Sequence, residues 1–492
     1  MFVKFMKLHD GARIELVTYA AIWISAVIYT IYSFVITSNK YFSYYIDSYS
    51  DFTEGWTFLS RKKDVADIEW ETIKFSLERS YLWIILLLFI SEILRKFKFV
   101  RILQLWQILI STAFILIELG PYPLSAILSQ PLIFLIVLTC HNKLFIWVCE
   151  IPILLLIGLL KSFTTDERKE HIIMLILFWL NLKCVSYCLD FIDSGQTQQK
   201  YLSYFSYCLY LPHIISGPFI SYKDFKGCHQ YSQNVSSRFL MLIKHLFRLL
   251  FWLLFLEFCL HFVYVNATEF HTKWIKKLDS CSLYGYGYTM GQFFHIKYVV
   301  SYGLANSFAR FEGVTVPSQP VCIGRIHLYS DMWKYFDAGL YNFLRRYIYI
   351  PLLRSGIFGT QLLSSFICFL FVYIWHGTDS LILLWTTLNY IGVATEIFSR
   401  WFYLHYLQNS KLFKNLEPKW LRRISCMAAS PLLAMSIISN FYFFSNLEIG
   451  QIFVSRILKE SSWWENAILF AILYTCCQVS TELRLRKLSK KQ

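Results

Sequence analysis

The stretch Leu16–Thr37 (LVTYAAIWISAVIYTIYSFVIT) contains no formally charged residue over 22 positions. A helix of that length rises ~1.5 Å per residue and can cross the ~30 Å hydrocarbon core of a bilayer. Lys4, Lys7 and Arg13 precede it, and no small-residue cleavage site of the secretory type follows. The segment therefore predicts a retained first membrane span, and the positive-inside rule predicts a cytosolic N-terminus.

The composition of the whole chain agrees with this first span. Hydrophobic residues make up 56% of the 492 residues and charged residues 16%, against ~45–50% and ~25% in soluble domains. So little charge excludes a soluble or disordered protein. The net charge of +15 comes from short basic clusters between apolar runs, as in loops that face anionic membrane lipids, and does not indicate a nucleic-acid binder.

Further apolar runs extend along the rest of the chain and predict an all-α polytopic membrane protein with a single domain over residues 1–492. A return span begins at Tyr81. The basic tail, residues 480–492, is predicted to be cytosolic, so the number of crossings is even; we expect ten, with the remaining runs re-entrant. The other runs are Ile102–Leu119, Leu124–Cys140, Leu144–Leu160, Ile172–Leu189, Phe239–Val265, Tyr284–Asn306, Leu362–Ile374, Leu381–Ile397, Ile424–Phe444 and Ala467–Val479.

Two segments depart from simple spans. Residues 38–80 carry six basic and eight acidic side chains, which predicts a luminal loop, and Asp64–Leu77 within it has the apolar spacing of an amphipathic helix on the membrane surface. Tyr210–Phe225 (YLPHIISGPFISYKDF) contains two prolines and a glycine. It predicts a re-entrant or broken helix, with a kinked span as the alternative.

His376 is the strongest candidate for chemistry, because an ionisable residue at membrane depth is costly. Only two formal charges lie between Arg354 and Arg400. This interval predicts a helical hairpin whose turn is Trp375–Ser380 (WHGTDS), with His376 deep in the membrane toward the lumen. A histidine that caps the hairpin by bonding to a carbonyl is the alternative.

Asp337 lies 39 residues before His376, in the candidate catalytic segment 331–378. A neutral imidazole can take a proton from an amine or hydroxyl, and a nearby carboxylate would orient it or stabilise the imidazolium. The alternative is an ion pair of Asp337 with Lys334 or Arg345 in a solvated loop. The spacing does not decide between these two arrangements.

Three further polar residues are candidates for contact with a substrate. Arg345 and Arg346 precede two tyrosines, and either anchor the chain at the interface, which we favour, or bind the phosphates of an acyl donor. Asn440 lies in the apolar run Ser436–Phe444. Its amide either bonds a neighbouring helix or donates to a bound carbonyl.

Several motifs together resemble the membrane-bound O-acyltransferase family over nearly the whole chain. The Trp-His-Gly piece is shared widely in that family, whereas the segment 332–351 is typical of the branch that acylates Hedgehog proteins. The motifs are KKDVADIEW (62–70), GPFISYKDF (217–225), MWKYFDAGLYNFLRRYIYIP (332–351), YIWHG (373–377) and SNFYF (439–443).

The resemblance implies a helical bundle around a transmembrane tunnel in the endoplasmic-reticulum membrane. It implies transfer of palmitate from palmitoyl-CoA to the N-terminal cysteine of a secreted ligand of the Hedgehog type or the epidermal-growth-factor type. His376 and Asp337 match the family's histidine and aspartate, Trp333 a tryptophan on the acyl-CoA path, and Asn440 an asparagine near the thioester. Cys322 resembles a haem-ligating cysteine, although its surroundings (VCIGRIH) depart from that pattern; a plain or palmitoylated thiol is the alternative.

Three other functions remain open. An O-acyltransferase acting on a lipid, sterol or serine hydroxyl would use the same histidine. A transporter is disfavoured because no paired, interrupted segments recur in two matching halves, and a non-catalytic scaffold because both His376 and Asp337 are present. No catalytic metal is implied.

Overall fold

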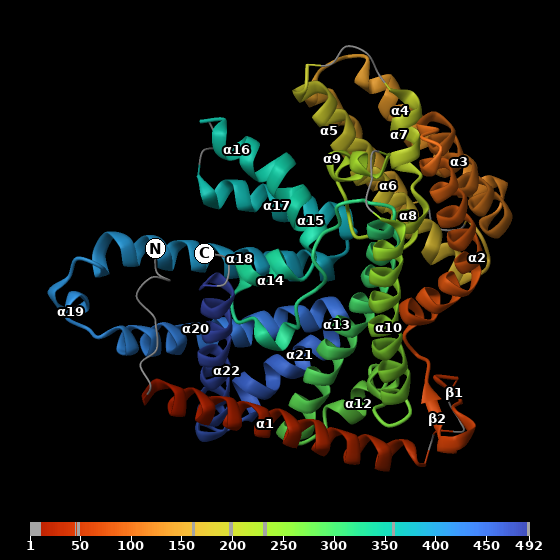
Figure 1. Ribbon diagram of the computed structural model, residues 1–492. Helices are drawn as coiled ribbons and strands as arrows, with labels where there is room; N and C mark the ends of the chain where they lie inside the picture. Colours follow the sequence, from red (N-terminus) through yellow and green to blue (C-terminus); the bar gives the residue numbers. More distant parts are fainter. Residues whose placement is uncertain are drawn as a thin grey trace.

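The computed structural model describes residues 11–44, 46, 50–159, 163–195, 200–229, 234–356 and 360–489. Lys4 and Lys7 of the predicted N-terminal basic cluster, and Lys490 and Lys491 of the predicted basic tail, lie outside these ranges. The described chain is almost wholly helical (Figure 1), which confirms the predicted fold class.

The longer helices are α1 (Gly11–Phe42), α2 (Ile68–Lys96), α3 (Val100–Phe114), α4 (Pro121–Leu138), α5 (Lys143–Leu159), α6 (Glu167–Asp193), α10 (Val235–Cys259), α13 (Ser280–Phe311), α17 (Gln361–His376), α18 (Ser380–Phe402), α20 (Pro418–Phe444) and α22 (Trp463–Ser489). The shorter ones are α7 (Tyr201–Cys208), α8 (Leu211–Ser216), α9 (Tyr222–Phe225), α11 (Val265–Thr268), α12 (Thr272–Ile275), α14 (Tyr329–Tyr335), α15 (Ala338–Phe343), α16 (Ile350–Arg354), α19 (Lys411–Lys414) and α21 (Leu447–Ser455). Strands β1 (Phe52–Glu54) and β2 (Lys62–Asp64) pair antiparallel.

Eight helices within the described residues are long and apolar enough to cross a membrane. The chain is therefore a multi-pass membrane protein, while the expected total of ten crossings stays a prediction. Several predicted runs lie on helices outside those eight, among them α5 and α17, which have 17 and 16 residues. Burial differs strongly between candidate spans: 83% of the apolar stretch of α6 is buried inside the protein, but only 6% of that of α1. The exposed apolar side chains of α1 are suited to contact lipid.

Helix α13 is central to the arrangement. It packs against α1 on one side and α10 on the other, and also contacts α8. In Figure 1 the helices from α2 to α9 lie on one side of α10 and α13, and α18, α20 and α22 lie on the other side. Helix α6 packs against α2, α4, α5 and α8. The two groups of helices thus meet around α13.

The helix predicted over Asp64–Leu77 begins four residues later, at Ile68. The chain enters α2 through strand β2, and Asp67 caps the helix by accepting a hydrogen bond from the backbone N–H of Trp70. Trp70 and Ile73 are buried against residues of α10 and α13, and the indole N–H of Trp70 donates to Glu257 of α10 at 2.7 Å. Ile68 is 48% exposed, so contact of the rest of this face with the membrane surface stays a prediction.

The segment Tyr210–Phe225 is broken, as one of the two alternatives predicted. Helix α8 ends at Ser216, the Gly217–Pro218 peptide bond is cis, and α9 begins at Tyr222. Gly217 has φ of 59°, and a Cβ at that position would lie 2.6 Å from the ring of Trp179. A glycine is therefore required both for the backbone conformation and for the close approach to α6.

The predicted hairpin is confirmed. Helix α17 ends at His376, Gly377 follows with φ of 116°, and α18 begins at Ser380. A positive φ directly after a helix is the usual conformation for glycine and stops the helix there. This local geometry fixes His376 as the last residue of α17.

Candidate active site

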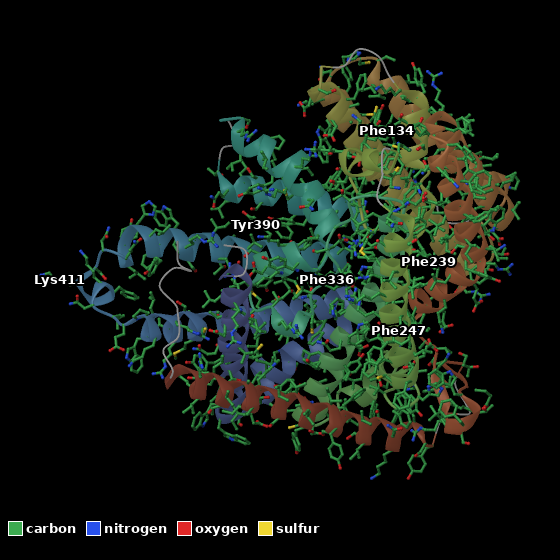
Figure 2. All side chains as sticks on the ribbon, viewed as in Figure 1. Phe134, Phe239, Phe247, Phe336, Tyr390 and Lys411 are labelled. Atoms are coloured by element: carbon green, nitrogen blue, oxygen red, sulfur yellow. The ribbon has the colours of Figure 1, made fainter. Side chains whose placement is uncertain are left out.

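A cavity of about 480 Å³ lies where nine of the described helices meet, within the ~300–1,000 Å³ usual for small-molecule sites. Phe336, one of its lining residues, lies near the middle of the molecule (Figure 2). The walls are mainly apolar and aromatic, with a few polar groups. The residues that carry the argument below come from α2 (Glu69, Thr72), α6 (Trp179), α13 (Tyr298, Tyr302), α14 (Trp333), the residue before α15 (Asp337), α17 (Trp375, His376), α18 (Trp385) and α20 (Asn440, Phe443).

His376 borders this cavity and is held by aromatic packing. The rings of Trp385 and Phe443 approach the imidazole edge to face, with centroids 5.3 and 5.2 Å away. No hydrogen bond joins His376 to any other residue that the structure describes, so the alternative of a hairpin cap bonded to a carbonyl is excluded. Both ring nitrogens are thus available to a bound substrate. Trp375 beside it is buried, and its indole N–H has no partner among the described residues.

Asp337 borders the same cavity as His376, in agreement with the prediction that the fold brings them together. Its carboxylate caps α15 by accepting the backbone N–H of Leu340 at 2.8 Å, and it also accepts the hydroxyl of Tyr302 at 2.9 Å. Burial raises the pKa of Asp337, although these two donors oppose that shift. The alternative of an ion pair in a solvated loop is therefore excluded.

The two candidate catalytic residues do not touch through a hydrogen bond. Within the described residues no such bond connects the carboxylate of Asp337 with the imidazole of His376, so the direct orientation expected from the sequence is not present. The aromatic rings of Trp385 and Phe443 orient the imidazole instead. The carboxylate can still interact with His376 through a substrate or electrostatically across the cavity.

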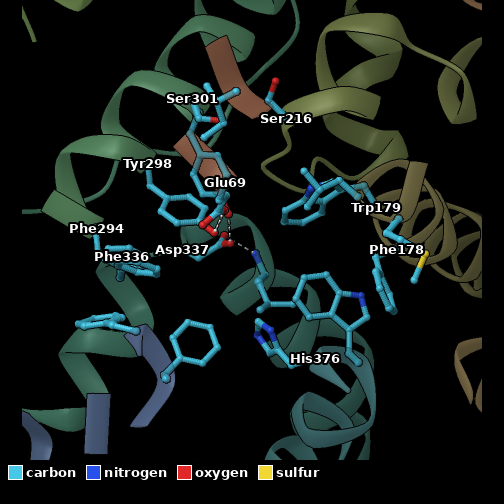
Figure 3. A pocket seen from close by; sticks show the side chains of 18 of the residues that line it. Glu69, Phe178, Trp179, Ser216, Phe294, Tyr298, Ser301, Phe336, Asp337 and His376 are labelled. Atoms are coloured by element: carbon cyan, nitrogen blue, oxygen red, sulfur yellow. Dashed lines mark hydrogen bonds between the residues drawn. The ribbon is translucent and has the colours of Figure 1, made fainter. Parts of the chain in front are cut away.

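A second carboxylate, that of Glu69, faces the cavity from α2. It accepts the hydroxyl of Tyr298 at 2.6 Å and pairs with the ammonium of Lys297 at 2.6 Å. Burial is the largest single effect and would raise the pKa of Glu69, but the charge and hydrogen bond of Lys297 and the hydrogen bond from Tyr298 together lower it. The Lys297 side chain is only 4% exposed and also pairs with Asp67 at 2.9 Å. Figure 3 shows Glu69, Tyr298 and Asp337 gathered at one end of the cavity, with His376 at the other.

Trp333 and Asn440 also border the cavity, as expected of substrate contacts. The indole N–H of Trp333 donates to Asn389 of α18 at 3.0 Å. The Asn440 side chain donates to the carbonyl of Ser436 at 3.0 Å and accepts from the indole of Trp385 at 3.3 Å. One N–H of the Asn440 amide remains for a ligand.

Arg345 and Arg346 do not border the cavity. Both are exposed, and Arg346 pairs with Asp190 of α6 at 2.8 Å. They are therefore excluded as contacts for the part of a donor that enters the cavity. A contact with phosphate groups outside it stays a prediction.

Cys322 does not line the second, smaller cavity of about 190 Å³, but Ile323 and Gly324, which follow it, do; this cavity shares Asn440 and Met332 with the first. The Cys322 thiol donates to the side-chain oxygen of Gln292 at 3.5 Å. The volume is below the ~300 Å³ at which small-molecule sites usually begin, so the residues around Cys322 do not fit a haem in this arrangement. Haem binding stays a prediction that the structure does not support.

The ionised part of the site does not stand out in the sequence. Lys297 lies within the predicted run Tyr284–Asn306, and an ionisable residue in such a run is a functional candidate. The carboxylates of Asp67 and Glu69 fall in a segment with the pattern of a surface helix, and that pattern does not reveal their partner in α13. Tyr298 and Tyr302 carry no charge, and only three-dimensional contact separates them from the other tyrosines of the chain.

Comparison with known proteins gives a consistent family. A family model described as MBOAT, membrane-bound O-acyltransferase family, matches residues 157–439. The protein-cysteine N-palmitoyltransferase Rasp of Drosophila melanogaster is 31% identical over 318 residues, 63% of each chain. The protein-cysteine N-palmitoyltransferase HHAT of Mus musculus is 29% identical over 357 residues, 68% of this chain and 71% of that one. The membrane-bound O-acyltransferase GUP1 of Candida tropicalis is 26% identical over 226 residues, 46% of this chain and 37% of that protein.

Proposed function

Because the chain belongs to the membrane-bound O-acyltransferase family, we propose that it transfers palmitate from palmitoyl-CoA to the N-terminal cysteine amine of a secreted signalling protein. The observation that carries this proposal is the single cavity that His376 and Asp337 share inside a multi-pass membrane protein. The similarity to Rasp and HHAT supports the choice of donor and of acceptor.

The reaction needs the loss of two protons from the nitrogen and a defined geometry. The α-ammonium first gives one proton to water, and the amine nitrogen then attacks the thioester carbonyl carbon; the C–N bond forms, and the C–S bond then breaks. His376 takes the second proton from the attacking nitrogen and gives it to the departing thiolate, so that amide and coenzyme A thiol result. Positioning of two reactants in one cavity supplies much of the rate.

Charge that develops on the thioester oxygen requires hydrogen-bond donors. Asn440 borders the cavity, and its amide donates to the carbonyl of Ser436, which leaves one N–H for a ligand. Donors that are fixed before the reaction starts stabilise an oxyanion without reorganisation. The rings of Trp333, Trp385 and Phe443 supply an apolar wall for the acyl chain near the thioester.

The remaining parts of the proposal concern compartments. Palmitoyl-CoA would enter from the cytosol and the acceptor from the lumen of the endoplasmic reticulum, with both ends of the chain cytosolic. Hedgehog proteins are the proposed acceptor class, because the segment 332–351 resembles the branch that acylates them. Arg345 and Arg346 lie outside the cavity, where the phosphates of coenzyme A would be exposed.

The proposal is tested with protein purified into lipid nanodiscs, fluorescent palmitoyl-CoA and a peptide that begins with cysteine. We expect an amide-linked fatty acyl group at the N-terminus, resistant to hydroxylamine and identified by mass spectrometry. An equimolar peptide with a blocked N-terminus and a free serine is the competing acceptor. Acylation of the serine peptide alone would contradict the proposal and favour the hydroxyl-directed activity that the name of GUP1 describes for that relative.

A further inference from the structure

We propose that the second cavity, of about 190 Å³, holds the distal half of the donor's alkyl chain, and that Gly291 of α13 determines which chain lengths can enter it. This inference rests on the proposed function, because it assigns a place to the acyl group of the same donor. It adds a limit on chain length to the transfer reaction.

The wall of the second cavity suits an alkyl chain. Helices α1, α13, α20 and α22, which are joined by pairwise contacts, supply most of this wall (Figure 1). None of the described residues in it is charged, whereas Glu69, Asp337 and His376 border the first cavity. A phosphate or an ammonium would lose its hydration in the second cavity without gaining a charged partner. An alkyl chain is stabilised there because it leaves water.

The two cavities meet beside the group assigned to the thioester. Four residues border both cavities: Ile323, Met332, Asn440 and Phe444. In the proposed reaction Asn440 donates to the thioester oxygen, so the carbonyl carbon lies at this boundary. His376 exchanges a proton with the amine nitrogen and with the sulfur, so both atoms lie on the His376 side of that carbon. The second cavity is then the direction in which the alkyl chain leaves it.

Gly291 lies at the passage between the cavities. A Cβ atom at this position would lie 2.9 Å from Cδ1 of Ile323 and 3.9 Å from Cε2 of Phe444, and both of these residues border both cavities. Carbon atoms pack best at ~3.5–4.0 Å, so a larger side chain at position 291 would project into the passage. The absence of a side chain at Gly291 leaves this space for the donor.

The size of the second cavity corresponds to part of a long chain. An apolar cavity of ~150 Å³ binds benzene, which has six carbons, so one of about 190 Å³ has room for about eight. This is about half of the sixteen carbons of palmitate, and the other half would lie in the first cavity. Helices α1 and α22 border only the second cavity and form its far wall, with Trp23 and Ala26 contributed by α1.

The experiment compares donors of three lengths, so it separates this inference from the proposed function. Transfer from octanoyl-, palmitoyl- and stearoyl-CoA to the peptide that begins with cysteine is measured as kcat/KM in nanodiscs. The proteins are wild type, Gly291→Val, Ala26→Leu and Trp23→Ala. Dissociation constants of the S-octyl and S-hexadecyl thioethers of coenzyme A, which cannot transfer an acyl group, are measured in parallel.

We expect Gly291→Val to have the largest effect. Each buried methylene contributes about fourfold to binding, so exclusion of about four of them should lower kcat/KM for palmitoyl-CoA about 100-fold or more. The value for octanoyl-CoA should change less than about threefold, because its chain ends before the passage. The thioethers should show the same contrast in their dissociation constants.

The two variants of the far wall should shift the limit in opposite directions. Leucine has three more carbons than alanine, so Ala26→Leu should displace about three methylenes and lower kcat/KM for palmitoyl-CoA about tenfold or more. Trp23→Ala enlarges the far end and should raise the kcat/KM ratio of stearoyl-CoA to palmitoyl-CoA about tenfold. These two variants test the second cavity without a change at a glycine, in case Gly291→Val does not fold.

The matched control is Ala21→Leu, the same substitution on the same helix. Ala21 is exposed and borders neither cavity, so all three donors should keep their wild-type values. A wild-type ratio of palmitoyl-CoA to octanoyl-CoA in both Gly291→Val and Ala26→Leu would overturn the inference and leave the proposed function intact, as would equal losses for both donors. Absence of transfer from every donor by the wild-type protein would overturn the proposed function, and the thioethers would still decide whether a long chain needs the second cavity.

Discussion

The two ends of the cavity are built by different physical means. At the carboxylate end, Glu69 and Asp337 are fixed by hydrogen bonds from Tyr298 and Tyr302, which are one turn apart on α13 with ring centroids 5.1 Å apart. At the aromatic end, His376 is fixed only by neighbouring rings. The difference leaves the imidazole nitrogens of His376 without a partner among the described residues, as a base requires, whereas both carboxylates are held by tyrosine hydroxyls.

The comparison also indicates how each end should respond to mutation. An isosteric change that removes one hydrogen bond should disturb the carboxylate end and leave the aromatic end intact. Removal of the imidazole at the aromatic end should abolish palmitate transfer while leaving the peptide that begins with cysteine bound. Four substitutions test this division, in order of expected effect.

His376→Ala should have the largest effect. Loss of a general base costs about 100-fold to 10,000-fold in rate, so kcat for palmitate transfer should fall at least 100-fold. The dissociation constant of the peptide that begins with cysteine should stay unchanged. His405→Ala is the control, because His405 is exposed and bonds only the carbonyl of Trp401. Transfer by His376→Ala within threefold of wild type would remove the assigned base.

Asn440→Ala should lower kcat by about 100-fold, the cost of one oxyanion donor. The change leaves the Trp385 indole without its acceptor, so the variant also reports whether Asn440 acts on the substrate or through that ring. Ser439→Ala is the neighbouring control: Ser439 is buried on the same helix but does not border the cavity. Equal losses in both variants would indicate a general disturbance of α20.

Asp337→Asn should lower kcat by about tenfold, near the lower end of the range for a group that assists proton transfer. Asparagine caps a helix nearly as well as aspartate, so α15 and its bond from the N–H of Leu340 should persist, and thermal stability should be close to wild type. Kinetic analysis with palmitoyl-CoA and the peptide that begins with cysteine separates kcat from KM. An unchanged kcat would leave Asp337 with a structural role only.

The sequence predicted the aromatic end better than the carboxylate end. His376 stood out because the interval between Arg354 and Arg400 is so poor in charge, and the turn after it defined the hairpin. Glu69 did not stand out, because its neighbourhood reads equally well as a surface helix. Its role depends on Lys297, which lies more than 200 residues away and meets it only through the packing of α2 on α13. Periodicity within one segment cannot report such a contact.

A related reason explains the aromatic orientation of the imidazole. The sequence indicates a histidine and an aspartate, and leaves open whether the carboxylate assists the imidazole or pairs with Lys334 or Arg345. In the fold, the N-terminus of α15 and the hydroxyl of Tyr302 already occupy the carboxylate. Residue types indicate the chemistry that is possible, but the competition among partners is decided by helix ends and packing.

Tyr302→Phe should have the smallest effect on rate and the most specific effect on pH dependence. The hydroxyl of Tyr302 donates to the Asp337 carboxylate and lowers its pKa against the larger, opposite effect of burial; without this donor the pKa should rise further. If transfer requires ionised Asp337, the acid limb of the pH–kcat profile should move to higher pH, with kcat reduced only a few-fold at alkaline pH, as expected for the loss of one hydrogen bond. Tyr298→Phe provides the contrast, because it removes a donor to Glu69 and not to Asp337, and should leave that limb in place. A limb that shifts equally in both variants would mean that the two carboxylates titrate as one unit.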